Sequence, residues 1–103
     1  MNPAPRQHTP GPWTILPNTP HFVRAMHPTE GMQPIATVYH FDGELAANAR
    51  LIAAAPELLE ACKKALMVIT SIKEVLKSDG MPSMLKIEKE IQQAISKAEA
   101  THD

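Results

Sequence analysis

Three aromatic side chains in this sequence have ring surfaces on which a purine or a nicotinamide-type ring could stack. They are Trp13, Tyr39 and Phe41, and stacking of this kind contributes about 1–3 kcal/mol per base. Rings of this size also fill the core of a small sheet, so for Tyr39 and Phe41 the pattern leaves both roles open. The aromatic residues therefore mark a candidate platform for a flat ligand.

Two arginines and one asparagine supply the polar groups that such a ligand would need. Arg24 and Arg50 are the arginines beyond the Pro-rich N-terminus, and a guanidinium makes planar, paired hydrogen bonds to phosphate that an ammonium does not. Asn48 falls in the first turns of an Ala-rich stretch, where backbone N–H groups without helical partners attract anions. Arg50 equally suits an exposed position on a helix face. The expected ligand-binding residues are Trp13, Arg24, Tyr39, Phe41, Asn48 and Arg50.

The residue types used in catalysis and metal binding occur here without the spacing that those functions need. None of the histidines pairs with another at i, i+4 on a helix, and no Cys or carboxylate cluster accompanies them; they are His8, His21, His27, His40 and His102. Cys62 lies in an apolar helical pattern, where a thiol is usually inert. No GxSxG, P-loop or GxGxxG motif is present. We expect no metal, no cofactor and no enzymatic activity.

Length and charge restrict the class of protein further. A chain of 103 residues suits a single domain, 1–103, whose modest core favours self-association. The formal net charge of −1 argues against broad electrostatic binding to a nucleic acid polymer or an anionic membrane. No apolar run reaches the ~20 residues of a membrane span, and the N-terminus lacks the basic and apolar regions of a secretory signal. We expect a cytoplasmic protein.

The composition changes near Gly43, which predicts an extended first part and a helical second part. Eight of the ten prolines and all four aromatics precede Gly43, whereas all seven lysines follow it. We predict a flexible arm over residues 1–11 and an antiparallel β-meander over residues 12–42. The expected strands are Pro12–Leu16, His21–Met26 and Pro34–Phe41. In the middle strand, Phe22 and Arg24 share one face.

Residues 44–101 are expected to be helical because Ala and Leu, which lose least on entering a helix, dominate their first part. We predict a short helix over Glu44–Ala54 that Asp42 caps. A bend and a longer helix follow at Pro56, and Pro82 opens a final helix, since proline suits a first helical turn. The predicted fold is α+β: a small N-terminal antiparallel sheet followed by a C-terminal antiparallel helical hairpin.

Apolar residues in the two long helices recur with the 3.5-residue period of packed helices. In the first helix they are Leu58, Cys62, Ala65, Ile69, Ile72 and Leu76, and in the second Met84, Ile87, Ile91, Ala94 and Ala98. Further apolar residues widen these seams, so the hairpin is expected to pack on the sheet, on a second copy, or on both. We expect a homodimer or larger assembly through helical residues such as Leu59, Leu66 and Ile69.

Three strings in the chain resemble a family of small proteins common in bacteriophages and prophages. They are HTPGPW at residues 8–13, IATV at residues 35–38 and ANARLIAAAPELL at residues 47–59. The resemblance covers about the first two-thirds of the chain, and it implies a phage origin without implying an activity.

The order of elements and site residues is also similar to that of the phage sponge proteins that counter the Thoeris defence system. Those proteins place an antiparallel sheet before two antiparallel helices, dimerise through the helices, and sequester a cyclised ADP-ribose signal without cleaving it; some also take cyclic oligonucleotides. Their pocket uses an N-terminal Trp, an Arg from the sheet, an aromatic residue ahead of the helices and an Asn near the helical start. By order along the chain, the resemblance assigns these roles to Trp13, Arg24, Tyr39 or Phe41, and Asn48, with Arg50 as a phosphate partner.

The function expected from these features is counter-defence in the cytoplasm of a bacterial host, by binding a cyclic ADP-ribose-type or cyclic nucleotide signal. The alternative is a protein-binding adaptor or inhibitor that uses an exposed apolar helical face on a host or phage protein. The neutral charge and the lack of a basic helix disfavour a DNA-binding regulator.

Overall fold

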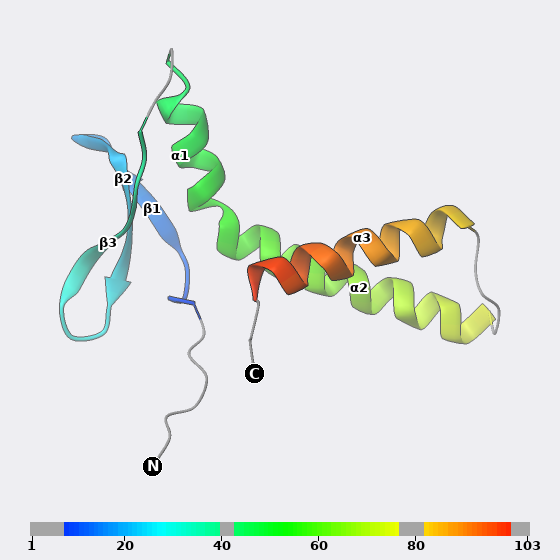
Figure 1. The fold of residues 1–103 in the computed structure, drawn as a ribbon. Coiled ribbons are helices and arrows are strands. Elements are labelled where there is room, and N and C mark those ends of the chain that lie inside the picture. The colour runs from blue at the N-terminus through cyan, green and yellow to red at the C-terminus, as the bar shows by residue number, and fades with distance from the viewer. Residues whose placement is uncertain (1–7, 40–42, 77–81, 100–103) are drawn as a thin grey trace. The chain divides into compact units, whose positions relative to one another are not determined.

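The computed structural model describes residues 8–39, 43–76 and 82–99. Its N-terminal part is an antiparallel sheet of three strands in the order β1-β2-β3 (Figure 1). The strands are β1 (Trp13–Leu16), β2 (Thr19–His27) and β3 (Gly31–Thr37). The predicted α+β class and the antiparallel sheet ahead of the helices are confirmed.

The sheet register fixes which side chains share a face. Trp13 pairs with Ala25 across β1 and β2, and Thr14 pairs with Arg24. The strand β3 begins and ends earlier than the predicted range from residue 34 to 41. Pairing resumes directly after the turn at Gly31, whose φ of 73° suits a residue without a side chain.

Three helices follow the sheet: α1 (Leu45–Ala53), α2 (Ala55–Leu76) and α3 (Pro82–Ala98). The residue before α1, Glu44, makes no capping bond through its side chain, and the expected cap Asp42 lies outside the described residues. Pro56 occupies the first turn of α2, where its missing N–H leaves no helical bond unmade. The predicted break between two helices and the start of the last helix at Pro82 are therefore confirmed.

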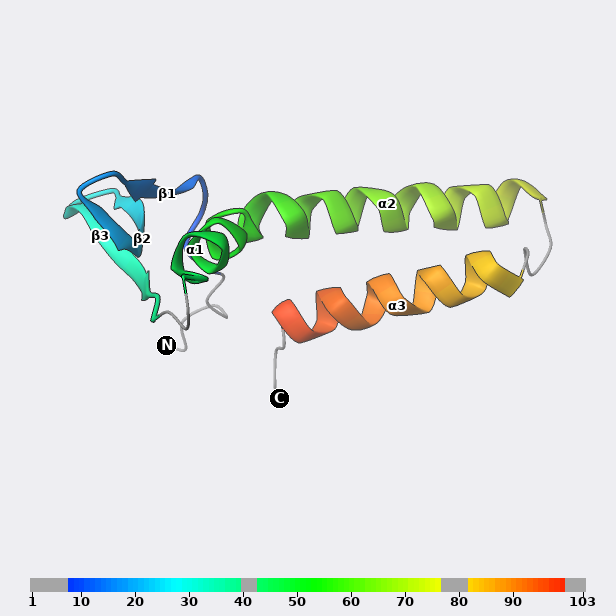
Figure 2. The same ribbon diagram turned by 90° about the horizontal axis from the view of Figure 1, so that it is seen from above.

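The chain divides into two compact units, and the first comprises Thr9–Leu58. Within it, α1 packs against β1 and β2 on one face of the sheet (Figures 1 and 2). Val23, Val38 and Ala49 form the buried centre of this layer. The partly buried residues around them are Trp13, Ile15, Ala36, Leu45, Ile52 and Ala53.

The second unit contains the helical hairpin from Leu59 onwards. Figure 2 shows α2 and α3 side by side and antiparallel, and ion pairs join Lys63 to Glu99 and Lys73 to Glu88 across them. The half-buried apolar residues of the hairpin are Leu59, Cys62, Leu66, Ile69, Met84, Leu85, Ile91 and Ile95. No described helix is long and apolar enough to cross a membrane.

The apolar seam expected between the two long helices is partly wrong. Several of its members are exposed instead, namely Leu58, Ala65, Ile72, Leu76, Ile87, Ala94 and Ala98. On α2, Cys62 and Ile69 of the predicted seam are half-buried toward α3, whereas the other inner positions lie one residue further along, at Leu59, Leu66 and Lys73. The charged residues Lys73 and Glu88 belong to this inner side because they pair with each other. A prediction that places every charged side chain in solvent does not identify Lys73 and Glu88 as inner residues.

Candidate functional site

The candidate site residues lie on two different sides of the sheet–helix layer. Val23 and Ala25 point toward α1 and are almost fully buried. Because strand side chains alternate, Arg24 points to the other face, which α1 does not cover. We call this surface the open sheet face, and Phe22 lies on it beside Arg24.

Trp13 lies on the helix-facing side and contributes to the core. It pairs with Ala25 in the sheet and packs against the buried cluster. Its indole Nε1 donates a hydrogen bond to the carbonyl oxygen of Thr9 at 3.0 Å. The ring is therefore partly buried and its polar edge is occupied, which leaves less of it for stacking than an exposed indole would offer.

Two of the motif strings meet in space next to Trp13. A Cβ atom added at Gly11 would lie 3.0 Å from Cβ of Pro56, which is closer than side chains normally approach. The HTPGPW string thus passes directly over the start of α2, where the ANARLIAAAPELL string continues. This packing explains why a glycine stands between two prolines at that point.

Asn48 and Arg50 flank the buried Ala49 on α1, and both are exposed. The backbone N–H of Asn48 donates to the carbonyl oxygen of Glu44 at 2.9 Å. That N–H therefore already has a partner within the helix, unlike the free donors expected at this position. Arg50 lies in the last turn of the helix, where a positive charge is favourable because of the helix dipole.

Of the other two predicted aromatics, the structure describes Tyr39. It follows the buried Val38 and is 79% exposed, while Phe41 lies outside the described residues. The structure brings Trp13 close to the layer that carries Ala49, but it places Arg24 on the opposite face of the sheet. The predicted residues that the structure describes therefore do not line a single surface of one chain.

Arg24 has the environment best suited to an anionic ligand. Its guanidinium lies over the ring of Phe22, with Cζ 5.0 Å from the ring centroid, a cation–π contact that holds the side chain in place. Its Nε is buried without a hydrogen-bond partner. Among the described residues, no carboxylate forms an ion pair with Arg24.

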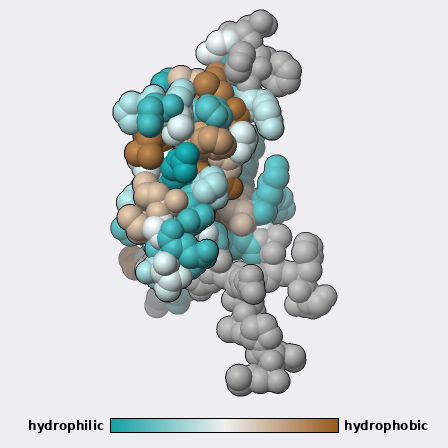
Figure 3. Space-filling view, turned by 90° about the vertical axis from the view of Figure 1, so that its left-hand side faces the viewer, coloured by the Kyte–Doolittle hydropathy of each residue, from teal (hydrophilic) through white to brown (hydrophobic). Residues whose placement is uncertain are grey.

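The neighbours of Arg24 complete the open sheet face. Thr14 lies beside it on β1 and Pro34 on β3, and the rings of His21 and Phe22 are 4.3 Å apart. Figure 3 shows this side of the molecule as hydrophobic residues interspersed with hydrophilic ones. Phe22 was not among the predicted site residues, although its i, i+2 spacing from Arg24 on a strand could have identified it.

The part of the chain that the structure describes contains no set of side chains arranged to bind a metal ion. No group of three or more His, Cys, Asp or Glu side chains lies close enough together there to hold a metal ion. Cys62 is half-buried on the inner side of α2.

These features define a small α+β protein in which a three-stranded sheet carries one helix on one face and a helical hairpin follows. Comparison with protein families identifies it further: the family described as Salmonella phage P22 protein Y8K6 matches residues 1–102. The chain belongs to this phage protein family. No curated protein and no solved structure matches it.

Proposed function

We propose that this phage protein binds and sequesters a small nucleotide signal, without cleaving it, in the cytoplasm of the bacterial host. The ligand class is a cyclic ADP-ribose-type molecule or a cyclic nucleotide of the kind used in bacterial immune signalling. The observation that carries the proposal is the guanidinium of Arg24, which the ring of Phe22 orients and which has no carboxylate partner among the described residues.

The chemistry of the open sheet face suits a phosphate joined to a flat base. A guanidinium whose donors are not taken by a carboxylate makes paired, charge-assisted hydrogen bonds to phosphate oxygens, and Arg24 has no carboxylate partner among the described residues. Thr14 stands next to it with a hydroxyl group. The net charge of −1 for the whole chain favours a small ligand over a nucleic acid polymer.

Arg24, and not Arg50, is the phosphate-binding residue in this proposal. Because the buried layer of Val23 and Ala49 lies between the open sheet face and the exposed side of α1, Arg24 and Arg50 cannot contact the same small ligand on one chain.

Sequestration works by stoichiometry: the protein lowers the concentration of free signal only when it outnumbers or out-binds the receptor for that signal. Binding without cleavage therefore accounts for counter-defence with no catalytic group.

A thermal-shift screen of the full chain against a panel of cyclic ADP-ribose isomers and cyclic nucleotides tests the proposal. One member of the panel is expected to raise the melting temperature, and mass spectrometry is expected to recover it unchanged. Arg24→Gln should abolish the shift, whereas the matched variant Arg50→Gln should keep it.

Three outcomes would contradict the proposal. The first is the absence of a shift with every member of the panel. The second is a shift that Arg24→Gln leaves intact, and the third is recovery of a cleaved ligand. An absent shift combined with specific capture of one host protein would support the protein-binding adaptor instead.

A further inference from the structure

The helical hairpin leaves one of its sides unpartnered. In the described residues of α2 and α3, no apolar side chain is fully buried, and the one buried residue is Glu88. Large apolar side chains of α2 are instead exposed to a marked extent: Met67 70%, Val68 57%, Ile72 38%, Val75 78% and Leu76 58%. Two helices alone cannot cover an apolar surface this wide.

Three of these exposed residues, Val68, Ile72 and Val75, belong to a second heptad pattern next to the one that faces the other helix. On α2, the exposed residues Ala61, Ala65, Val68, Ile72 and Val75 are spaced 4, 3, 4 and 3 apart. On α3, Ile87, Ala94 and Ala98 are exposed with a spacing of 7 and 4. We call these eight residues the outer seam. A 3.5-residue repeat is the pattern that a helix needs to pack along another helix.

The two halves of the outer seam lie on the same side of the hairpin. The inner positions are those that face the other helix, such as Leu66 and Ile69 on α2 and Ile95 on α3. On each helix the outer-seam residues come one residue before these positions, which is a rotation of about 100° around the helix axis. Because α2 and α3 are antiparallel, this rotation turns both sets toward one side. One residue after the inner positions gives the other side, which carries the exposed Met67 and a set of mostly polar residues, namely Glu60, Lys63, Thr70, Glu74, Lys86, Lys89, Gln92 and Ser96.

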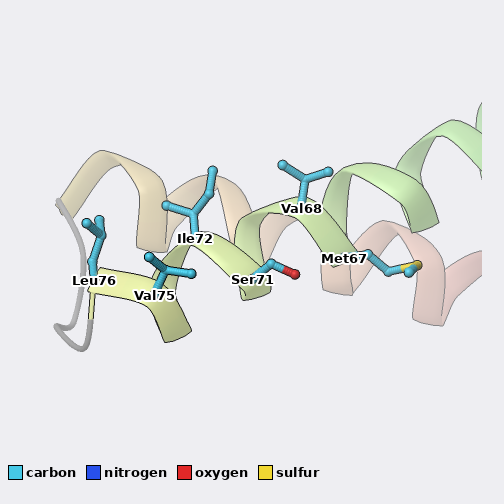
Figure 4. A pocket seen from close by; sticks show the side chains of 6 residues that line it. All are labelled: Met67, Val68, Ser71, Ile72, Val75 and Leu76. Carbon is cyan, nitrogen blue, oxygen red and sulfur yellow. The ribbon is translucent and has the colours of Figure 1, made fainter.

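The α2 half of the outer seam is uncharged, and the side chains around it form a shallow apolar groove. The groove has a volume of about 400 Å³ and is lined by Met67, Val68, Ser71, Ile72, Val75 and Leu76. Figure 4 shows these side chains projecting from α2, with α3 behind that helix. On α3 the same side also carries the exposed Glu90. Within the groove itself a charged partner would find nothing to pair with, whereas a second uncharged surface meets it without desolvating an ion.

We propose that the outer seam of α2 is the interface with a second copy of this chain, which pairs its own α2 antiparallel across a two-fold axis. Two copies of an uncharged seam are self-complementary, as a two-fold interface requires. Val68 is the middle one of the five α2 positions, with Ala61 and Val75 seven residues away on either side, and with Ala65 three residues before it and Ile72 four residues after it. The axis therefore passes close to Val68.

The area of the groove reaches the minimum for an interface between two copies. Its five large apolar side chains are 38–78% exposed, which corresponds to roughly 500 Å² per copy and about 1,000 Å² for two, the least that a biological interface is expected to bury. The interface differs from the one expected from the sequence, because Leu59, Leu66 and Ile69 are half-buried on the inner side. Together the two hairpins form a four-helix arrangement.

Sedimentation of the full chain at micromolar concentration tests the proposal. The wild type is expected to be a dimer, and Val68→Glu should raise its dissociation constant by at least about 100-fold because a charge would enter the centre of the seam. Thr70→Glu adds the same charge to the exposed polar side of α2, and it should leave the dimer intact. Far-UV circular dichroism checks that both variants keep their helices.

Disulfide cross-linking provides a second readout that does not depend on a destabilising charge. In a Cys62→Ser background, Val68→Cys is expected to cross-link to its own equivalent under mild oxidation, whereas Thr70→Cys should not. A monomeric wild type, a dimer that Val68→Glu does not weaken, or cross-linking through residue 70 in place of residue 68 would overturn the proposal. A complex with a different protein through this seam, without self-association, would overturn it as well.

Discussion

The sheet–α1 unit and the helical hairpin solve the problem of burying apolar surface in different ways. In the first unit, Val23, Ala25, Val38 and Ala49 are shielded from solvent by the sheet on one side and α1 on the other. In the described part of the hairpin, the sole buried residue is the charged Glu88, while apolar side chains of α2 remain exposed. The first unit therefore has a complete two-layer core and the second has half of one.

This difference indicates where each unit obtains its stability. A sheet with a helix across it closes its own core, so the first unit can be rigid enough to present Arg24 and Phe22 on its open face. A two-helix hairpin holds itself together by ion pairs and half-buried residues, and it gains most when a further surface covers it. Self-association and ligand binding are thus expected to depend on different units.

Among the substitutions that test this difference between the two units, the largest loss of stability is expected in the core of the first unit. Val23 is 0% exposed, and Val23→Ala should lower the free energy of unfolding by about 2–3 kcal/mol through lost burial and a cavity. Denaturant unfolding followed by Trp13 fluorescence measures this, because the indole packs against that core. The control Met26→Ala, on the same strand but 64% exposed, should cost less than about 0.5 kcal/mol. Equal costs for the two variants would mean that the first unit lacks a distinct core.

The fold could be predicted from the sequence because its local signals agree. Prolines and β-prone residues precede Gly43, Ala- and Leu-rich helical patterns follow it, and Pro56 and Pro82 mark helix starts. The placement of the seam was less predictable, since Leu59 and Leu58 are neighbours that fit heptads rotated by about 100°. Spacing alone does not say which heptad faces the partner helix, whereas the ion pair between Lys73 and Glu88 does.

A smaller effect is expected from the buried charge of the hairpin. Lys73 Nζ donates to Glu88 Oε1 at 2.8 Å, and the carboxylate side chain is only 12% exposed. Glu88→Gln should cost about 1–2 kcal/mol, because it leaves the ammonium of Lys73 without its charged acceptor. Heat unfolding followed by far-UV circular dichroism measures the change, with the exposed Glu90→Gln as the matched control.

A double variant distinguishes pairing from packing at the same site. Lys73→Met combined with Glu88→Leu replaces both charges by apolar groups, and it should restore or exceed the stability of the wild type. Destabilisation of the double variant beyond Glu88→Gln alone would show that the charges hold the hairpin together in a way that apolar packing cannot replace. The hairpin could then no longer be described as the unit with an incomplete apolar core, in contrast to the sheet–α1 unit.

The candidate site was harder to predict than the fold, because a site depends on which strand face and which helix side each residue occupies. Order along the chain grouped Trp13 with Arg24, yet the register pairs Trp13 with Ala25 and so places the two side chains on opposite faces. Alternation within β2 did predict that Phe22 and Arg24 share a face. Local periodicity is therefore informative within an element, whereas convergence between elements needs the register.

The smallest change in stability is expected at the second ion pair of the hairpin, between Lys63 and Glu99. It is best detected through the pH dependence of stability. The hydrogen bond to Glu99 raises the pKa of Lys63, burial of the ammonium opposes this, and the charges of Glu99 and Glu60 raise the pKa further. A cation with a raised folded pKa stabilises the fold at lower pH and loses this contribution as the pH rises through that pKa. The stability difference between the wild type and Lys63→Met should therefore be constant up to about pH 10.5, the ordinary pKa of a lysine, and be lost as the pH rises through the raised pKa of the folded state.

The same titration on Lys64→Met removes the effects of other alkaline groups. Lys64 is exposed and forms no ion pair among the described residues, so its variant should follow the wild type at every pH. Both side chains of the Lys63–Glu99 pair remain more than one-third exposed, and solvent screening keeps the contribution of such a pair small. A difference for Lys63→Met that grows at alkaline pH would contradict the sign of the raised pKa. It would also mean that the ammonium of Lys63 destabilises the hairpin, whereas the contact of Lys73 with Glu88 stabilises it.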